Sequence, residues 1–398
     1  MEIRLDGPAG GPLAGIRVLD LSTIVSGPLC GQMLGDLGAD VVKIEAPPVG
    51  DTARFLGGSQ RAGMSAFFAQ FNRNKRSLRL DLKSEAGASA FRRLAAEADV
   101  VLENFRPGVM PRLGLGYERL AAANPRLVYL SISGFGPDGP YADLPAYDMI
   151  IQALSGFARQ LGSDEEPKLI RNVMADKTSG VTAAWAVLAA LFAREKTGRG
   201  QRVDVPMLDA FAGLVLADSY GAQAFDPPEQ AAGAAAAGEA LFRAWPTRDG
   251  HVAVIVIEDH QFQALCRALG TPDVAHDPRF RTLMDRVQHG VELFEMLGAG
   301  LQSFTTAEIV ERARAEGAPV APVNDVAAFL EDEQVRASRI VFDLPHPEAG
   351  PIPVFRSAPR FSDTPSTVHR LPPKHGEHSA EILREAGFTE DEIADLER

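Results

Sequence analysis

The chain has 398 residues, 45% of them hydrophobic and 23% charged, which are globular proportions and exclude a disordered or fibrous protein. Forty Lys and Arg residues against 53 Asp and Glu residues give a net charge of −13, which argues against nucleic acid or a membrane surface as the main partner. Two cysteines cannot form a disulfide framework, and neither a secretory signal nor a membrane-spanning run is visible. We therefore expect a cytoplasmic enzyme of two or three domains.

The first third of the chain alternates strand and helix patterns. Strand patterns lie at residues 16–21, 39–45, 77–82, 100–104 and 126–133, and helix patterns lie at 27–38, 84–98 and 117–123. This alternation predicts a mostly parallel sheet with helices on its faces. Gly27, Gly31 and Gly35 share one face of the first helix, which predicts close packing there. No GxGxxG follows the first strand, which counts against an NAD or FAD enzyme.

The remaining patterns predict a second domain inserted into the first. Further along the chain we expect a strand at 169–175, a helix at 178–194, a strand at 198–205 and, after a Pro-rich stretch at 344–373, two short helices at 379–386 and 389–397. The expected organisation is a large α/β domain beginning at 1–224, an Ala/Gly/Pro-rich linker at 225–240, a small α+β domain at 241–325, and a return crossover with the rest of the large domain at 326–398. Thr305 and Glu308 form a capping-box pattern that predicts a helix at 306–316.

Two basic groups stand out on this acidic chain. The denser one lies within residues 71–79, and the other, at 104–114, follows a predicted strand. Ligands of open α/β sheets bind beyond the carboxyl ends of the strands, so both groups suggest a small ligand that carries phosphate. An ordinary solvated face would explain the same pattern.

Asp176 lies between an apolar strand pattern and a long apolar helix pattern. It has two interpretations: a helix-capping carboxylate, or a nucleophile that the helix N–H groups keep ionised at neutral pH. Gly180 is expected to leave one side of this turn open to a bulky substrate. Eight histidines and two cysteines lack the spacing of metal ligands, so no metal is expected.

Motifs along nearly the whole chain resemble the family III CoA-transferases, a group that includes formyl-CoA and carnitine CoA-transferases and α-methylacyl-CoA racemase. The motifs are PLAGIRVLDLS (12–22), SGP (26–28), GADVVKIEAP (38–47), NKRSLRLDLK (74–83), VLENFRPG (101–108), GFGPDGPY (134–141), YDMIIQALSG (147–156), TGRGQRVDVPMLDA (197–210) and HGEHSAEILREAGFTEDEI (375–393). The resemblance implies a Rossmann-like open parallel sheet built from both chain ends, with a smaller inserted domain. It also implies a homodimer of two interlocked, ring-shaped chains.

The resemblance also implies which residues form the site. Asp176 stands in the place of the catalytic aspartate of the family, and Gly134, Phe135 and Tyr147 are expected to line the substrate. The implied contacts to CoA, which is a substrate and not a permanently bound cofactor, are Ile24, Val25, Asn72, Arg73, Lys75, Arg76, Asn104, Phe105 and Arg112.

The implied reaction moves CoA from an acyl-CoA donor to a free carboxylic acid through an aspartyl anhydride and an aspartyl-CoA thioester. The alternative is a 2-methylacyl-CoA racemase, in which a histidine partners the aspartate. Here Tyr147 stands at the histidine position, and its ordinary pKa near 10 makes it a poor proton shuttle. Val25 and Ser133 replace Gln and Lys of the formyl-CoA branch, and Ala46 replaces a frequent Arg, so the acceptor acid stays open.

Overall fold

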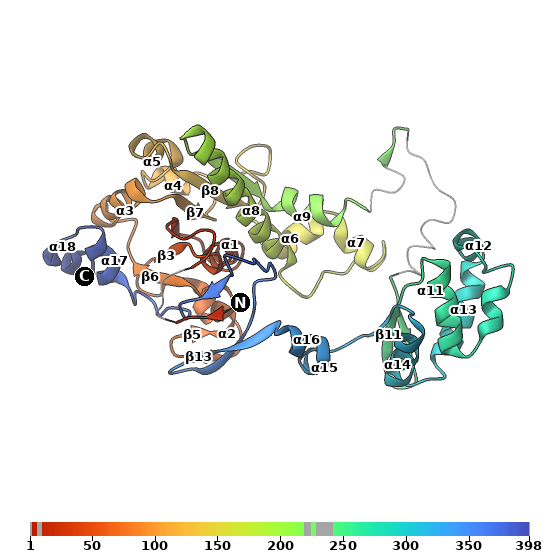
Figure 1. Ribbon diagram of the computed structural model, residues 1–398. Coiled ribbons are helices and arrows are strands. Elements are labelled where there is room, and N and C mark those ends of the chain that lie inside the picture. The colour runs from red at the N-terminus through yellow and green to blue at the C-terminus, as the bar shows by residue number, and fades with distance from the viewer. Residues whose placement is uncertain (1, 6–9, 219–223, 228–241, 398) are drawn as a thin grey trace. The chain divides into compact units, whose positions relative to one another are not determined.

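The computed structural model describes residues 2–5, 10–218, 224–227 and 242–397. The chain forms two compact units (Figure 1): the first combines residues 1–219 with 339–398, and the second is 220–338. The sequence predicts the small domain at 241–325. Of the predicted linker, residues 228–240 lie outside the described part of the chain.

A six-stranded parallel sheet forms the centre of the first unit. Its strands are β2 Arg17–Asp20, β3 Asp40–Glu45, β6 Lys75–Arg79, β7 Val100–Glu103, β8 Val128–Ser133 and β9 Arg202–Pro206. They stand in the order β6-β3-β2-β7-β8-β9, and each neighbouring pair is parallel, which confirms the sheet predicted from the sequence. This is the Rossmann strand order, which reverses between β2 and β7. Ligands of such sheets bind in the crevice at the carboxyl ends of those two strands.

Helices cover both faces of the sheet (Figure 1). The helices of the first unit are α1 Ser26–Asp36, α2 Ala66–Phe71, α3 Glu85–Glu97, α4 Val109–Arg112, α5 Tyr117–Ala123, α6 Asp148–Leu154, α7 Phe157–Leu161, α8 Met174–Thr197, α9 Met207–Val215, α17 Ser379–Glu385 and α18 Glu390–Glu397, with a 3-10 turn at Thr52–Phe55. In strand β7, successive side chains point to opposite faces of the sheet and so pack with different layers of helices. Val100 and Leu102 pack with α1 and α8, whereas Val101 packs with α3 and α5.

The C-terminal segment lies against the edge strand β6. The backbone N–H groups of Ser77 and Arg79 donate to His378 Nδ1 (3.3 Å) and Ser379 Oγ (3.0 Å), and the His378 N–H donates to the Ser77 carbonyl (3.0 Å). Near the other end of the chain, strand β1 Glu2–Ile3 pairs with β15 Thr367–Val368. Both ends of the chain therefore build this unit.

Two short hairpins complete the first unit. Strands β13 Val341–His346 and β14 Gly350–Phe355 pair antiparallel in and beside the stretch that was expected to be a Pro-rich crossover. Strands β4 Gln60–Arg61 and β5 Met64–Ser65 form the other hairpin.

The second unit is an α+β unit with its own core. Its antiparallel sheet consists of β10 Ala244–Pro246, β11 His251–Val254 and β12 Val320–Pro322. Its helices are α11 Asp259–Leu269, α12 Leu283–Gln288, α13 Gly290–Leu301, α14 Thr306–Glu316, α15 Val326–Glu331 and α16 Glu333–Ser338, with a 3-10 turn at Pro272–His276. The predicted capping box of Thr305 and Glu308 opens α14. Trp245, Phe262 and Leu297 lie in its buried core.

Candidate active site

The side chain of Asn104, the first residue after β7, joins the carboxyl end of β7 to the loop that follows β2. Asn104 Oδ1 accepts from the Thr23 N–H (2.9 Å), and Nδ2 donates to the Thr23 carbonyl (2.8 Å) and to Ser26 Oγ (3.2 Å). Thr23 lies in the loop after β2, and Ser26 begins α1. The asparagine therefore holds the chain where α1 starts, at the point where the strand order reverses.

The same loop contains an unusual backbone conformation. Ile24 has a φ of +70°, which is strained for a β-branched residue. Its N–H donates to Asp51 Oδ1 (3.1 Å), and Asp51 is itself paired with the buried Lys43 (2.9 Å). Such conformations persist where surrounding contacts over-determine them, often at functional sites. Ile24 was expected to contact CoA; its N–H is engaged within the fold, and the residue is half-buried.

Asp176 lies in the first turn of α8, not after a strand. The strand expected at 169–175 is wrong, because α8 begins at Met174 and the residues before it form no strand. Backbone groups of that segment hydrogen-bond to the buried Gln152 of α6 instead. Its Oε1 accepts from the Ile170 N–H (2.8 Å), and its Nε2 donates to the Asn172 carbonyl (3.1 Å). A side chain thus replaces a neighbouring strand as the backbone's partner.

A second carboxylate approaches Asp176. Oδ2 of the buried Asp148, at the start of α6, accepts a hydrogen bond from the Asp176 N–H (3.0 Å). Burial and the charge of Asp148 raise the pKa of Asp176 to about 7, against the opposing effect of a hydrogen bond from Ser26. Burial and the charge of Asp148 therefore oppose the ionised form that the helix N–H groups were expected to favour at neutral pH.

Gly180 follows Asp176 by one helical turn and marks the contact between α8 and α1. A Cβ atom at this position would lie 2.6 Å from the Ser26 carbonyl oxygen, so only glycine fits. The expectation that Gly180 leaves room for substrate is wrong. Its small size instead brings the first turn of α8 against the start of α1, and this places Asp176 beside Ser26.

Three of the basic side chains of the dense group at 71–79 are buried and engaged in ion pairs. Arg73, Lys75 and Arg76 are no more than 3% exposed, and Asn72 Nδ2 donates to the Phe68 carbonyl (2.9 Å). The pairs are Arg73 with Asp36 (2.6 Å), Lys75 with Asp20 (2.8 Å), and Arg76 with Asp40 (2.6 Å), Glu381 (3.0 Å) and Glu385 (2.9 Å). The group is thus neither a solvated face nor a set of charges that are free to hold phosphate.

The glycine face of α1 packs on these pairs, which confirms its predicted close packing. A Cβ at Gly31 would lie 2.7 Å from Asp20 Oδ2, and one at Gly35 would lie 3.0 Å from Asn74. Burial lowers the pKa of Lys75 to about 8, although the adjacent Asp20 favours the charged form.

The other predicted site residues follow the carboxyl ends of the strands. Val25 is buried, Phe105 packs partly against the α3–α5 layer, and Arg112 is exposed on α4. A Cβ at Gly134, just after β8, would lie 2.2 Å from Ala146 Cβ, so the chain before α6 packs against the end of β8. There Tyr147 is 68% exposed.

Beside Gly134, Phe135 is half-buried and makes an edge contact with Tyr141, with ring centroids 5.5 Å apart.

Of the residues described so far, Asn104, Ser26, Asp148 and Asp176 form one connected group, and the basic cluster lies outside it.

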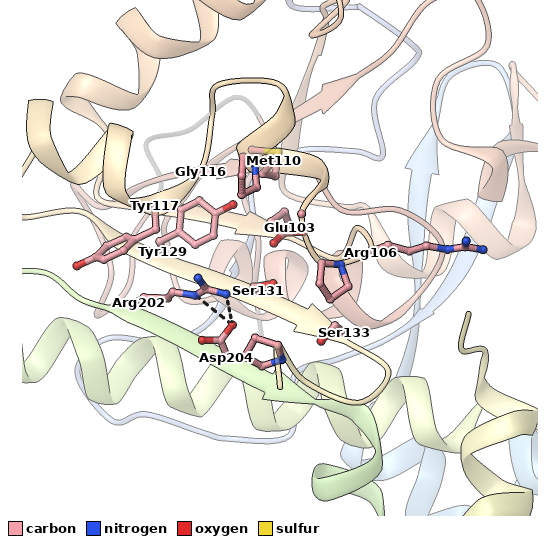
Figure 2. A pocket seen from close by; sticks show the side chains of 14 residues that line it. Glu103, Arg106, Met110, Gly116, Tyr117, Tyr129, Ser131, Ser133, Arg202 and Asp204 are labelled. Carbon is pink, nitrogen blue, oxygen red and sulfur yellow. Dashed lines mark hydrogen bonds and ion pairs between the residues drawn. The ribbon is translucent and has the colours of Figure 1, made fainter. Parts of the chain in front are cut away.

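A cavity of about 200 Å³ opens next to this site, on the α4–α5 side of the sheet (Figure 2). Its lining includes Glu103. Burial raises the pKa of the Glu103 carboxyl to about 7, although hydrogen bonds from Ser131 and the Phe105 N–H act in the opposite direction. Arg106 extends away from the other lining side chains. Asp176 does not line this cavity.

No group of three or more His, Cys, Asp or Glu side chains among the described residues could hold a metal ion. No helix in the described ranges is long and apolar enough to cross a membrane. Cys30 and Cys266 are buried free thiols, and burial raises the pKa of both, which makes them unreactive.

Comparisons with known proteins agree across nearly the whole chain. Residues 13–379 match the family model for CoA-transferase family III. The chain is 36% identical to the succinate–glutarate CoA-transferase of Agrobacterium fabrum, over 94% of this chain and 95% of that protein. It is 35% identical to the succinyl-CoA–L-malate CoA-transferase beta subunit of Chloroflexus aurantiacus, over 97% and 96%. A crystal structure of a CAIB/BAIF family protein from Brucella suis matches with a TM-score of 0.82 and 36% identity, over 95% and 100%.

Proposed function

The chain belongs to CoA-transferase family III, and on that premise we propose that it moves CoA from an acyl-CoA donor to a free carboxylic acid, with Asp176 as the nucleophile. One observation carries the proposal. Asp176 is a largely buried carboxyl beside the start of α1, and no cation is ion-paired with it in the described part of the chain. A pKa of about 7 leaves a reactive carboxylate available at neutral pH.

The proposed chemistry needs only acyl exchanges. An Asp176 oxygen attacks the thioester carbonyl, and the C–S bond breaks. CoA thiolate departs, and an acyl-aspartyl anhydride remains on the enzyme. The thiolate attacks the aspartyl carbonyl, which gives an aspartyl-CoA thioester and releases the donor acid. The acceptor carboxylate then attacks this thioester to form a second anhydride and release CoA thiolate. Attack of the thiolate on the acceptor's acyl carbon yields the new acyl-CoA and regenerates Asp176.

Each tetrahedral intermediate needs hydrogen-bond donors for its oxyanion. The N–H groups of Ser26 and Gly27 lie in the first turn of α1, where the helix itself offers them no acceptor, and no side chain caps this helix. We propose these two N–H groups as the oxyanion donors, since Ser26 lies beside Asp176.

For CoA we propose contacts at the carboxyl ends of β2 and β7. Arg106 and Arg112 are exposed and make no ion pair within the described residues, so their charges are available to phosphate. Ile24 of the loop and Phe105, both half-buried, remain as neighbouring contacts, and Val25 is left out because it is fully buried. We leave out Asn72, Arg73, Lys75 and Arg76, because all four are engaged inside the fold.

A dicarboxylate is our proposed acceptor class. The two relatives described above are named for succinate, glutarate and L-malate. Succinyl-CoA with glutarate or L-malate is therefore the first donor and acceptor set to assay. Racemisation is not proposed, because these relatives are named as transferases and Tyr147 replaces the histidine of the racemase branch.

The test of the nucleophile is Asp176→Asn. We expect CoA transfer to fall at least a hundredfold, a loss of about 3 kcal/mol or more, with CoA affinity unchanged. Wild-type enzyme incubated with acyl-CoA and then hydroxylamine should carry a modification on the peptide that contains Asp176. Asp209→Asn, on α9, is the matched control and should keep wild-type activity. An Asp176→Asn variant that keeps more than a hundredth of the wild-type rate would rule out covalent catalysis at this residue.

We also propose the homodimer of interlocked chains. Large apolar side chains of α6, α8 and α9 are exposed on the first unit, which is a typical interface composition. They are Met149, Ile150, Leu154, Val181, Trp185, Phe192 and Leu214. Light scattering should give twice the chain mass of 42.6 kDa at micromolar concentration. A mass of one chain would refute the dimer.

A further inference from the structure

Ser26 is buried at the meeting point of α1, α8 and the end of β7. It is 2% exposed, and its Oγ accepts a hydrogen bond from Asn104 Nδ2 (3.2 Å). An amide nitrogen is a donor only, so the serine's own hydroxyl hydrogen is left for another acceptor. Asp176 lies one helical turn before Gly180 on the face of α8 that meets α1 at the Ser26 carbonyl, which brings its carboxylate beside the serine. Ser26 lowers the pKa of Asp176, as a hydroxyl that donates to the carboxylate does. The hydroxyl is therefore oriented from behind by an amide and aimed at a carboxylate.

The backbone fixes this arrangement from two sides. Asn104 also binds both polar groups of Thr23, so its amide cannot rotate without breaking two hydrogen bonds to the loop. Gly180 brings α8 against the Ser26 carbonyl oxygen, so the two helices cannot separate at this point without losing their contact. The distance between the hydroxyl and Asp176 thus depends on packed backbone and not on a mobile side chain.

We propose that Ser26 is a positioning residue for Asp176, and that Asn104 orients the serine hydroxyl for this task. The inference rests on the proposed role of Asp176 as nucleophile. A single donor leaves the other carboxylate oxygen free, and that oxygen is the one that attacks the thioester. The hydroxyl also favours the ionised carboxylate, against burial and against the negative charge of Asp148.

Ser26→Ala tests the proposal by two measurements as a function of pH. The first is the rate of CoA transfer from succinyl-CoA to glutarate. The second is labelling of the Asp176 peptide by a carbodiimide, which reacts with protonated carboxyls and is followed by mass spectrometry. Loss of one hydrogen bond to a charged group should move both midpoints upward by about one pH unit. At pH 7 the rate should fall about fivefold and should recover at pH 9.

Two further variants serve as controls. Ser179→Ala removes a buried hydroxyl of α8 that donates to the Ala175 carbonyl (2.6 Å), and it should leave both midpoints unchanged. Ser26→Thr keeps a hydroxyl and should keep the wild-type midpoints. If the alanine variant does not fold, Ser26→Cys gives the same test, because a thiol of similar size is a weak donor and should shift the midpoints in the same direction.

The two measurements separate this inference from the proposed function. Unchanged midpoints in an active Ser26→Ala enzyme would overturn the role of Ser26 alone. A wild-type protein that transfers no CoA from any acyl-CoA tested would overturn the proposed function, and the positioning role with it, even if carbodiimide labelling still shifts. An upward shift of both midpoints in an active enzyme supports both proposals.

Discussion

The ion-pair network beneath α1 and the carboxyl pair at the start of α8 are two buried charged regions with opposite electrostatics. In the network, which includes Lys75 with Asp20 and Lys43 with Asp51, each buried charge lies within 2.9 Å of an opposite one. At the carboxyl pair, Asp148 approaches the backbone of Asp176, and no cation is ion-paired with either side chain in the described ranges. Against the effect of burial, Lys75 and Lys43 lower the pKa of Asp20, whereas burial and Asp148 raise the pKa of Asp176. Pairing does not always prevail in the network, because burial outweighs Arg73 and raises the pKa of Asp36.

The difference separates charges that maintain the fold from charges that are available for chemistry. A buried ion pair with matched partners has no capacity left for a ligand, and removal of one partner exposes the desolvation cost of the other. A buried carboxyl without a cation destabilises the fold but stays reactive near neutral pH. Neutralisation of a charge should therefore have opposite effects on stability in the two regions.

The largest expected effect is in the network. Lys75→Met removes the ammonium group and leaves the buried Asp20 without this ion-pair partner. We therefore expect the free energy of unfolding to fall by about 3–5 kcal/mol. Urea denaturation at pH 7 measures this. Lys83→Met, at an exposed position, is the matched control and should change stability by less than about 0.5 kcal/mol. Unchanged stability combined with a loss of CoA affinity would show that Lys75 is a ligand contact after all.

The smaller effect, of opposite sign, is at the carboxyl pair. The pKa of Asp176 is about 7 in the fold and has an ordinary value of 3.8, so the unfolded chain loses this proton first. The folded state is therefore destabilised progressively as pH rises from about 4 to 7. Asp176→Asn removes the penalty and should stabilise the protein by up to about 2 kcal/mol at pH 8, with a smaller gain at pH 5. Urea denaturation at both pH values tests this, and a less stable variant at pH 8 would contradict the comparison.

The sheet was predictable from the sequence because its signals are local. The strands that contain Val18, Val41 and Val128 are short hydrophobic runs bounded by helix patterns, and such runs identify parallel strands without knowledge of distant partners. The β13–β14 hairpin escaped detection because Pro345, Pro351 and Pro353 interrupt its pattern, and proline is tolerated only in a two-stranded, edge-like setting of this kind.

The site was predictable only in part. The resemblance points to Asp176 as the proposed nucleophile, but the groups that shift its pKa lie 28 residues away at Asp148 and on another helix at Ser26. The basic cluster was misinterpreted for the same reason, since Arg73 and Lys75 pair with carboxylates 37 and 55 residues away. Charge density along a sequence does not show which charges folding will neutralise.

The segment just before α17 covers the edge strand β6, and this has a consequence for biosynthesis. Ser77 and His378, which hydrogen-bond through their backbones, are 301 residues apart. At roughly 5–20 residues per second, a ribosome needs about 15–60 s to make the intervening chain. For that time the edge of the nascent sheet is without its cover, and an uncovered edge strand is a template for pairing with other chains. Yield of soluble protein should therefore depend on how well the cell shields this edge until synthesis ends.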